Sequence, residues 1–95
     1  MTPLQFINSC LSGSQIINEI KESTQYEEHE LFGAWVAECA LEDDGVFDMT
    51  KDTIDAHFEQ LSCAVKDVEF DKEAALKYAE RLVSKILEDV SYDYL

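Results

Sequence analysis

Residues 25–44 constrain the fold most, because they hold the only tryptophan of the chain within a helical apolar pattern. Apolar residues recur there at the spacing of one helix face: Leu31, Phe32, Ala34, Trp35, Val36, Cys39 and Ala40. Gly33 interrupts this arc, although glycine weakens a helix by about 1 kcal/mol relative to alanine. We therefore predict an amphipathic helix whose apolar side, with a largely buried Trp35, forms the spine of the core. We expect Gly33 to allow the close approach of another helix.

The same apolar period predicts four more helices. Thr2-Pro3 is typical of a helix start, and Thr50 (or Asp48) and Asp71 are caps ahead of apolar stripes. The predicted helices span residues 3–11, 15–23, 25–42, 51–66 and 72–90. Three glycines and one proline leave little material for a many-turned β fold. We predict an all-α fold: a compact single-domain bundle of four to five helices, covering residues 1–95, with short connections.

Local signals give further expectations about helix ends. Leu11 extends the apolar stripe of the first helix, and Gly13 is expected to end that helix in the left-handed conformation. Ser14 is a candidate cap for the second helix. Thr24 with Glu27 has the spacing of a capping box for the third. Phe47 is expected to turn into the core.

Charge is the outlier of the composition, with 21 acidic residues against seven basic ones and a formal net charge of -14. Such a chain repels nucleic acids and anionic membranes and is attracted to basic surfaces. The chain starts Met1-Thr2-Pro3 without a basic and apolar signal, and its apolar runs are too short to span a bilayer. We expect a cytoplasmic protein that binds neither membrane nor nucleic acid directly. Its three cysteines form no CxxC pair and are expected to be free, mostly buried thiols.

No motif identifies a reaction. His29-Glu30 begins like a zinc-protease helix, but Gly33 stands where the second histidine is needed. A calcium loop centred on Gly45 fails because its first and last positions are Ala40 and Lys51. We therefore predict no metal, no cofactor and no enzymatic activity. A nucleophilic cysteine paired with a histidine across helices stays open as an alternative.

The distribution of the acids carries more information than their number. No lysine or arginine lies between Lys21 and Lys51. Acids at the start of the third helix suit the positive end of its dipole, whereas acids at its end oppose the negative end. Stability alone therefore does not explain the second group. We predict a partner-binding acidic surface made of Glu27, Glu28, Glu30, Glu38, Glu42, Asp43, Asp44 and Asp48. The alternative is a solvated face that tolerates the cost.

These observations favour a non-enzymatic inhibitor or antagonist that binds a basic partner, such as a toxin, a nuclease or a nucleic-acid-binding complex. Immunity proteins, anti-CRISPR or anti-restriction proteins and DNA mimics are of this kind. The pattern Phe6…Leu11-Ser12-Gly13 is similar to helical immunity proteins of nuclease colicins, over a stretch too short to assign the chain to them. The alternative functions are a structural or adaptor bundle, dimeric through an apolar face, and an enzyme with an unrecognised Cys/His site. The protein is expected to be a monomer or a homodimer.

Overall fold

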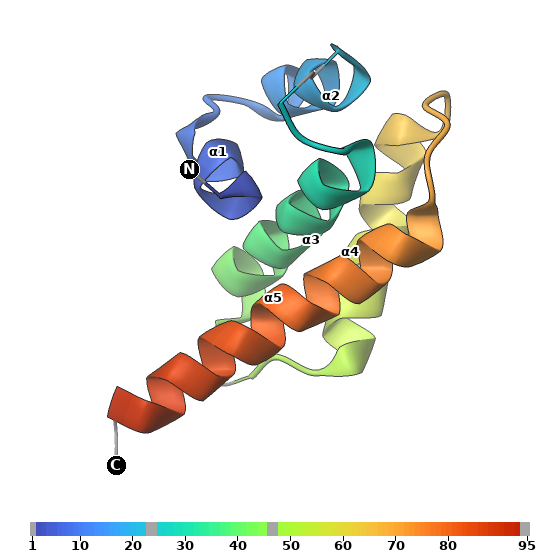
Figure 1. Ribbon diagram of the computed structural model, residues 1–95. Coiled ribbons are helices and arrows are strands. Elements are labelled where there is room, and N and C mark those ends of the chain that lie inside the picture. Colours follow the sequence, from blue (N-terminus) through green and yellow to red (C-terminus); the bar gives the residue numbers. More distant parts are fainter. Residues whose placement is uncertain (1, 23–24, 46–47, 94–95) are drawn as a thin grey trace.

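The computed structural model describes residues 2–22, 25–45 and 48–93. These residues form five α-helices, one short 3-10 helix and no strand, which confirms the predicted all-α bundle (Figure 1). The helices are α1 (Pro3–Ser9), α2 (Gly13–Glu22), α3 (Glu28–Asp44), α4 (Lys51–Ser62), η1 (Cys63–Val65) and α5 (Lys72–Asp93). The radius of gyration is 12.9 Å, close to the roughly 12 Å expected of a compact chain of this length.

Helix α3 lies at the centre of the bundle and packs against each of the other α-helices, most extensively against α5 (Figure 1). Residues 31–37 are buried without a break, so this part of α3 is covered on every side. The prediction of an amphipathic helix is therefore wrong for the middle of α3. A helix that is buried on every side has apolar residues on every side. In α3, the faces without large apolar side chains carry the small residues Gly33, Ala34 and Ala37.

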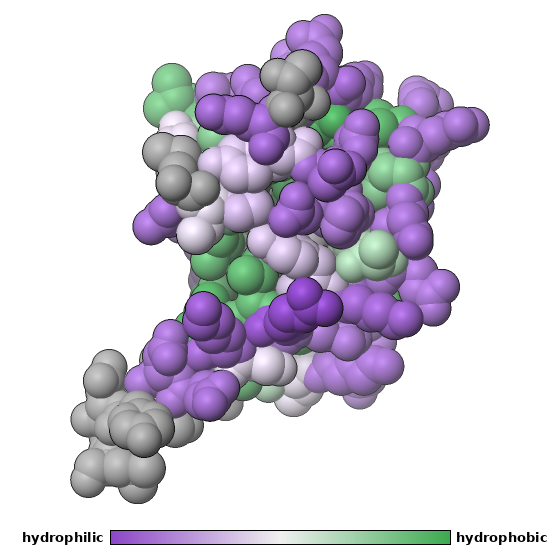
Figure 2. All heavy atoms as spheres, in the orientation of Figure 1, coloured by the Kyte–Doolittle hydropathy of each residue, from purple (hydrophilic) through white to green (hydrophobic). Residues whose placement is uncertain are grey.

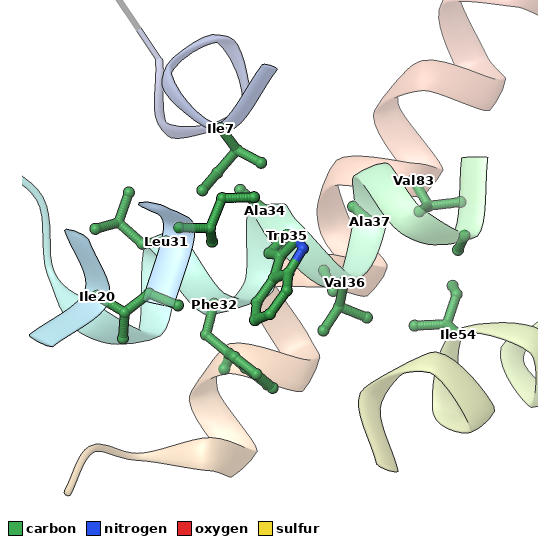
Figure 3. Close-up of a cluster of buried hydrophobic side chains, with 14 of the residues drawn as sticks. Ile7, Ile20, Leu31, Phe32, Ala34, Trp35, Val36, Ala37, Ile54 and Val83 are labelled. Atoms are coloured by element: carbon green, nitrogen blue, oxygen red, sulfur yellow. The ribbon is translucent and has the colours of Figure 1, made fainter. Parts of the chain in front are cut away.

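Side chains from all five α-helices meet around α3 (Figure 3). Trp35 is 7% exposed, which confirms the expectation that it is largely buried. The ring of Phe32 is the centre of an aromatic cluster. Its centroid lies 6.3 Å from that of Trp35, 5.6 Å from Phe58 and 5.3 Å from Phe70, within the range of favourable aromatic pairs.

Gly33 lies where α3 and α5 cross. A Cβ atom at this position would lie 2.7 Å from the backbone oxygen of Ala75 and 2.9 Å from Cδ1 of Tyr78. The expected close approach of another helix is confirmed, and that helix is α5. The loss of helix propensity at Gly33 is therefore offset by the packing of the two longest helices.

Three expectations near the N-terminus are wrong. Helix α1 ends at Ser9, and its C-cap residue Cys10 is extended, so Leu11 leaves the apolar stripe and is 94% exposed. Gly13 does not end α1 in the left-handed conformation but begins α2. Among the described residues, Gly45 is the only one with a positive φ. The hydroxyl of Ser12, not Ser14, accepts a hydrogen bond from the Gln15 N–H at 3.2 Å at the start of α2.

Other helix ends differ from the prediction by a few residues. Helix α3 begins at Glu28, and the Glu30 carboxylate accepts the Glu27 N–H at 3.3 Å. Helix α4 gives way to η1 after Ser62, and α5 continues to Asp93. Thr24 and Phe47, for which a cap and a core position were predicted, lie outside the described residues.

Two predicted caps are confirmed. The Thr50 hydroxyl accepts the Thr53 N–H at 3.2 Å, and the Asp71 carboxylate accepts the Ala74 N–H at 3.0 Å. These bonds satisfy backbone donors that the first turn of a helix leaves free. Within the described ranges, no helix is both long and apolar enough to cross a membrane.

Candidate functional site

The C-terminal half of α3 lines a cleft of about 260 Å³ together with α1 and the start of α2. Trp35, Glu38, Cys39 and Glu42 face it from α3, at the i, i+3, i+4 and i+7 spacing of one helix face. Ile7 and Ile16 add apolar surface from the other two helices. The cleft therefore combines an apolar wall with two carboxylates.

Glu38 is half-buried in this cleft, and its partner is neutral. With its amide oriented so that the nitrogen faces Glu38, the orientation that the surrounding donors and acceptors require, Asn8 on α1 donates to Oε1 at 2.9 Å and to Oε2 at 2.7 Å. Burial and, next, the negative charge of Glu42 raise the pKa of Glu38 above its ordinary value. No lysine or arginine is among the residues that line the cleft. Glu38 and Glu42 therefore share a negative site that has no counter-charge.

The thiol of Cys39 is affected by the same negative field. Burial, and next the negative charges of Glu42, Asp43 and Glu38, together raise its pKa to about 11. The pKa of Cys10 is also raised, first by burial and then by Glu19. Both thiols are therefore protonated at neutral pH and are not the thiolate that nucleophilic catalysis needs.

The prediction of mostly buried thiols needs one correction. Cys63 is exposed, because α4 ends just before it and η1 turns it away from the core, whereas Cys10 and Cys39 are half-buried. The cleft that Cys10 and Cys39 line contains no histidine. In the described part of the chain, no group of three or more His, Cys, Asp or Glu side chains is placed to hold a metal ion.

The last turn of α3 has a partner that the sequence analysis missed. Nε2 of His57, on α4, lies 3.2 Å from Oδ2 of Asp44 and 3.7 Å from Oδ2 of Asp43. His57 is thirteen residues beyond Asp44, so only the antiparallel packing of α4 on α3 brings them together. The short connection between the two helices was the only feature of the sequence that indicated this packing. Asp43 nevertheless keeps 69% of its side chain exposed, and Asp44 keeps 39%.

The predicted acidic residues separate into two groups at opposite ends of α3. Glu27, Glu28 and Glu30 lie at its start, and Glu38, Glu42, Asp43 and Asp44 lie in its last two turns, with Asp48 exposed in the connection that follows. The helix is about 25 Å long at 1.5 Å per residue. Because residues 31–37 between the groups are buried, the eight carboxylates do not form one continuous face of α3.

The C-terminal group is not neutralised by lysine or arginine. Within the ranges that the structure describes, the only ion pair made by a lysine or arginine joins Lys77 to Glu73 at 3.9 Å. That pair connects exposed side chains of α5, and such pairs contribute little to stability. We call Glu38, Glu42, Asp43 and Asp44 the α3 C-terminal acids.

No family model matches the chain, and no curated protein or solved structure matches it.

Proposed function

We propose that this protein is a non-enzymatic antagonist that binds a basic protein partner, with the α3 C-terminal acids at the centre of its docking surface. One observation carries the proposal: Glu42, Asp43 and Asp44 lie at the negative end of a helix dipole, and within the described residues no lysine or arginine pairs with them. The acids at the start of α3 need no such explanation, because their position stabilises the helix. Candidate partners are toxins, nucleases and nucleic-acid-binding complexes, whose basic surfaces normally face phosphate groups.

The geometry gives such a surface a rigid support. Glu42, Asp43 and Asp44 are exposed at the end of the most deeply buried helix, so their backbone is fixed by the core. Fixed carboxylates steer a basic partner during diffusion and set the register of the complex, more than they add affinity. Binding is therefore expected to weaken strongly as salt rises, since exposed charges are screened over about 10 Å at 0.1 M ionic strength.

The test is capture of a partner from lysate of the source organism by the immobilised protein and by two charge-reversed variants. The first variant carries Glu42→Lys, Asp43→Lys and Asp44→Lys. The control carries Glu59→Lys, Asp67→Lys and Glu69→Lys, which changes the net charge equally at three exposed positions on α4 and in the connection before α5. We expect the first variant to lose the partner and the control to retain it, at physiological salt.

Two results would contradict the proposal. One is a partner that both variants capture equally. Binding would then depend on the total charge of the protein, or not on its charge at all, and not on the position of these acids. The other is a captured partner that remains bound without loss at 1 M salt, where the screening length falls to about 3 Å.

A second candidate function is a structural or adaptor role through an apolar face. Met49, Ile54, Val83 and Leu87 line a second cleft, of about 240 Å³, between the start of α4 and α5. Figure 2 also shows apolar surface over the C-terminal half of α3, next to the hydrophilic side chains that cover α5. Sedimentation equilibrium separates the two functions. A dimer at micromolar concentration that persists at high salt favours the adaptor role, and a monomer disfavours it.

A further inference from the structure

We propose that the cleft between α1, the start of α2 and α3 receives an arginine side chain of the partner, with Trp35 along its stem and Glu38 and Glu42 at its guanidinium. This inference rests on the proposed function, and it names the chemistry that the partner presents. The partner is then a protein with a protruding arginine, rather than one with a uniformly basic surface.

The apolar part of the cleft suits a long aliphatic stem. Ile7, Ile16 and Trp35 line it, and each is largely buried with an edge toward the cleft. Gly13 lies over the indole: a Cβ atom there would be 3.8 Å from Cζ2 of Trp35, in ordinary contact. Because glycine lacks that atom, this edge of the indole stays accessible from the cleft. Arginine buries its methylene groups on such surfaces while its charged head remains near polar groups.

The polar part of the cleft suits the head group. Glu38 and Glu42 are one helical turn apart on α3, and both line the cleft. Burial and, next, the charge of Glu42 raise the pKa of Glu38, and a cation between the two carboxylates would relieve their repulsion. Asn8 fixes the Glu38 carboxylate from the opposite wall through two hydrogen bonds. A carboxylate that is already held in place loses little side-chain freedom when it binds a ligand.

Two features favour guanidinium over ammonium. A guanidinium is less strongly hydrated, so it enters a half-buried site at lower cost than the lysine head group. Its planar fork binds carboxylates through two parallel hydrogen bonds.

Leu11 gives the cleft a rim that a protein partner can contact. It is the one large apolar residue that is almost fully exposed in the described part of the chain, and it lines the same cleft. An exposed leucine beside a concave site is a natural apolar contact around a central anchor. This is the arrangement of binding hot spots, where a desolvated anchor is surrounded by contacts that exclude water.

The test is a titration of the whole protein with N-acetyl-arginine amide, followed by the fluorescence of Trp35 and by amide NMR shifts. N-acetyl-citrulline amide is the matched control, because it has the same length and shape but a neutral urea head. N-acetyl-lysine amide tests the preference for guanidinium. We expect saturable binding of the arginine probe with a millimolar Kd, and at least about tenfold weaker binding of both controls.

Two variants place the site. Glu42→Gln is expected to weaken the arginine probe about tenfold, whereas Glu59→Gln, which removes an exposed charge on α4 outside the cleft, is expected to leave its Kd unchanged. Circular dichroism checks that both variants are folded. Equal binding of the citrulline probe, equal binding of the lysine probe, or equal weakening by both variants would each overturn the inference.

The inference and the proposed function can fail independently of each other. If the cleft ignores the arginine probe but the variant with lysines at 42, 43 and 44 loses its partner, the inference is wrong and the docking surface stands. If the probe binds the cleft but that variant keeps its partner, the proposed function is wrong. The cleft is then a site for a small guanidinium ligand, and the part of the inference that assigns it to a partner protein is overturned as well.

Discussion

The two ends of α3 carry acids for different physical reasons. At its start, Glu28 and Glu30 face the positive end of the helix dipole, and Glu30 accepts the Glu27 N–H. At its other end, Glu42, Asp43 and Asp44 face the negative end, and there is no basic residue in the last turn. The first group is explained by the helix on which it lies. The second group is not.

The structure reduces this contrast but does not remove it. His57 lies within ion-pair distance of Asp43 and Asp44, and Asn8 holds Glu38. Neither partner is a permanent cation. Within the described residues, Glu42 makes no hydrogen bond or ion pair, and after burial its charge is the next cause that raises the pKa values of Glu38 and Cys39. Glu42 disfavours the ionised forms of two neighbours, so selection for stability alone would not favour a carboxylate at this position. It is therefore a candidate for selection by function.

The two acidic groups are separate only if the middle of α3 is buried on every side. Gly33→Ala tests the packing of this segment, and it has the largest expected effect. The added Cβ would lie 2.7 Å from the Ala75 backbone oxygen, which cannot move without shifting α5. We expect the free energy of unfolding to fall by about 1–3 kcal/mol, although alanine is the better helix former. Urea unfolding measures the change.

Gly13→Ala is the matched control for Gly33→Ala. Its Cβ would meet Trp35 at an ordinary 3.8 Å, so we expect stability to be unchanged or raised by up to about 1 kcal/mol. If Gly33→Ala proves as stable as the parent protein, α3 and α5 do not pack as closely as described. The segment of α3 between the two acidic groups would then not be buried on every side.

Removing one charge from each end of α3 should change stability in opposite directions. We expect Glu28→Gln to lower the free energy of unfolding by about 0.3–1 kcal/mol and Glu42→Gln to raise it by a similar amount, at low ionic strength. Both effects should shrink in 1 M NaCl. Thermal and urea unfolding of the two variants give the signs. Two changes of the same sign would show that the ends do not differ as proposed.

Glu38 gives the smallest expected effect, seen as a pH dependence. Its pKa is raised above 4.5 in the folded protein by burial and by Glu42, so the folded state binds this proton more tightly than the unfolded state. The contribution of Glu38 to stability is therefore lost as the pH rises through its folded pKa. We expect Glu38→Gln to become more stable relative to the parent protein as the pH rises from about 4 to about 7.

A double variant checks the cause of that dependence. Glu42→Gln removes the charge of Glu42, which is the second cause of the raised pKa of Glu38. In that background, the effect of Glu38→Gln on stability should therefore vary less with pH. An unchanged pH dependence would mean that Glu42 does not act on Glu38. The two carboxylates would then not form one negative site.

What could be predicted from sequence is mostly local. The apolar period gave the five helices, the burial of Trp35 and the packing role of Gly33, because each depends on neighbours within a few turns or on the absence of a side chain. The exposure of Leu11 was missed because α1 ends two residues earlier than its apolar stripe suggests. Apolar spacing alone does not show where a short helix stops.

The site was predictable only in part. The α3 C-terminal acids were recognised from their conflict with the helix dipole, which is a local property. The cleft and the His57 contact depend on how α1, α2 and α4 lie on α3. Asn8 and Glu38 are thirty positions apart, and no pattern in the chain joins them. One acidic surface was predicted from both groups of acids because the burial of residues 31–37 on every side of α3 was not foreseen.

The most direct test is to find which end of α3 a basic ligand chooses. A short arginine-rich peptide is titrated into the labelled protein at about 0.15 M salt, where the screening length is about 8 Å, and amide NMR shifts are mapped along the chain. We expect the largest shifts at residues 38–45 and around the cleft, with little change at residues 27–30. Equal shifts at both ends, or larger shifts at the start of α3, would contradict a docking surface at its C-terminal end.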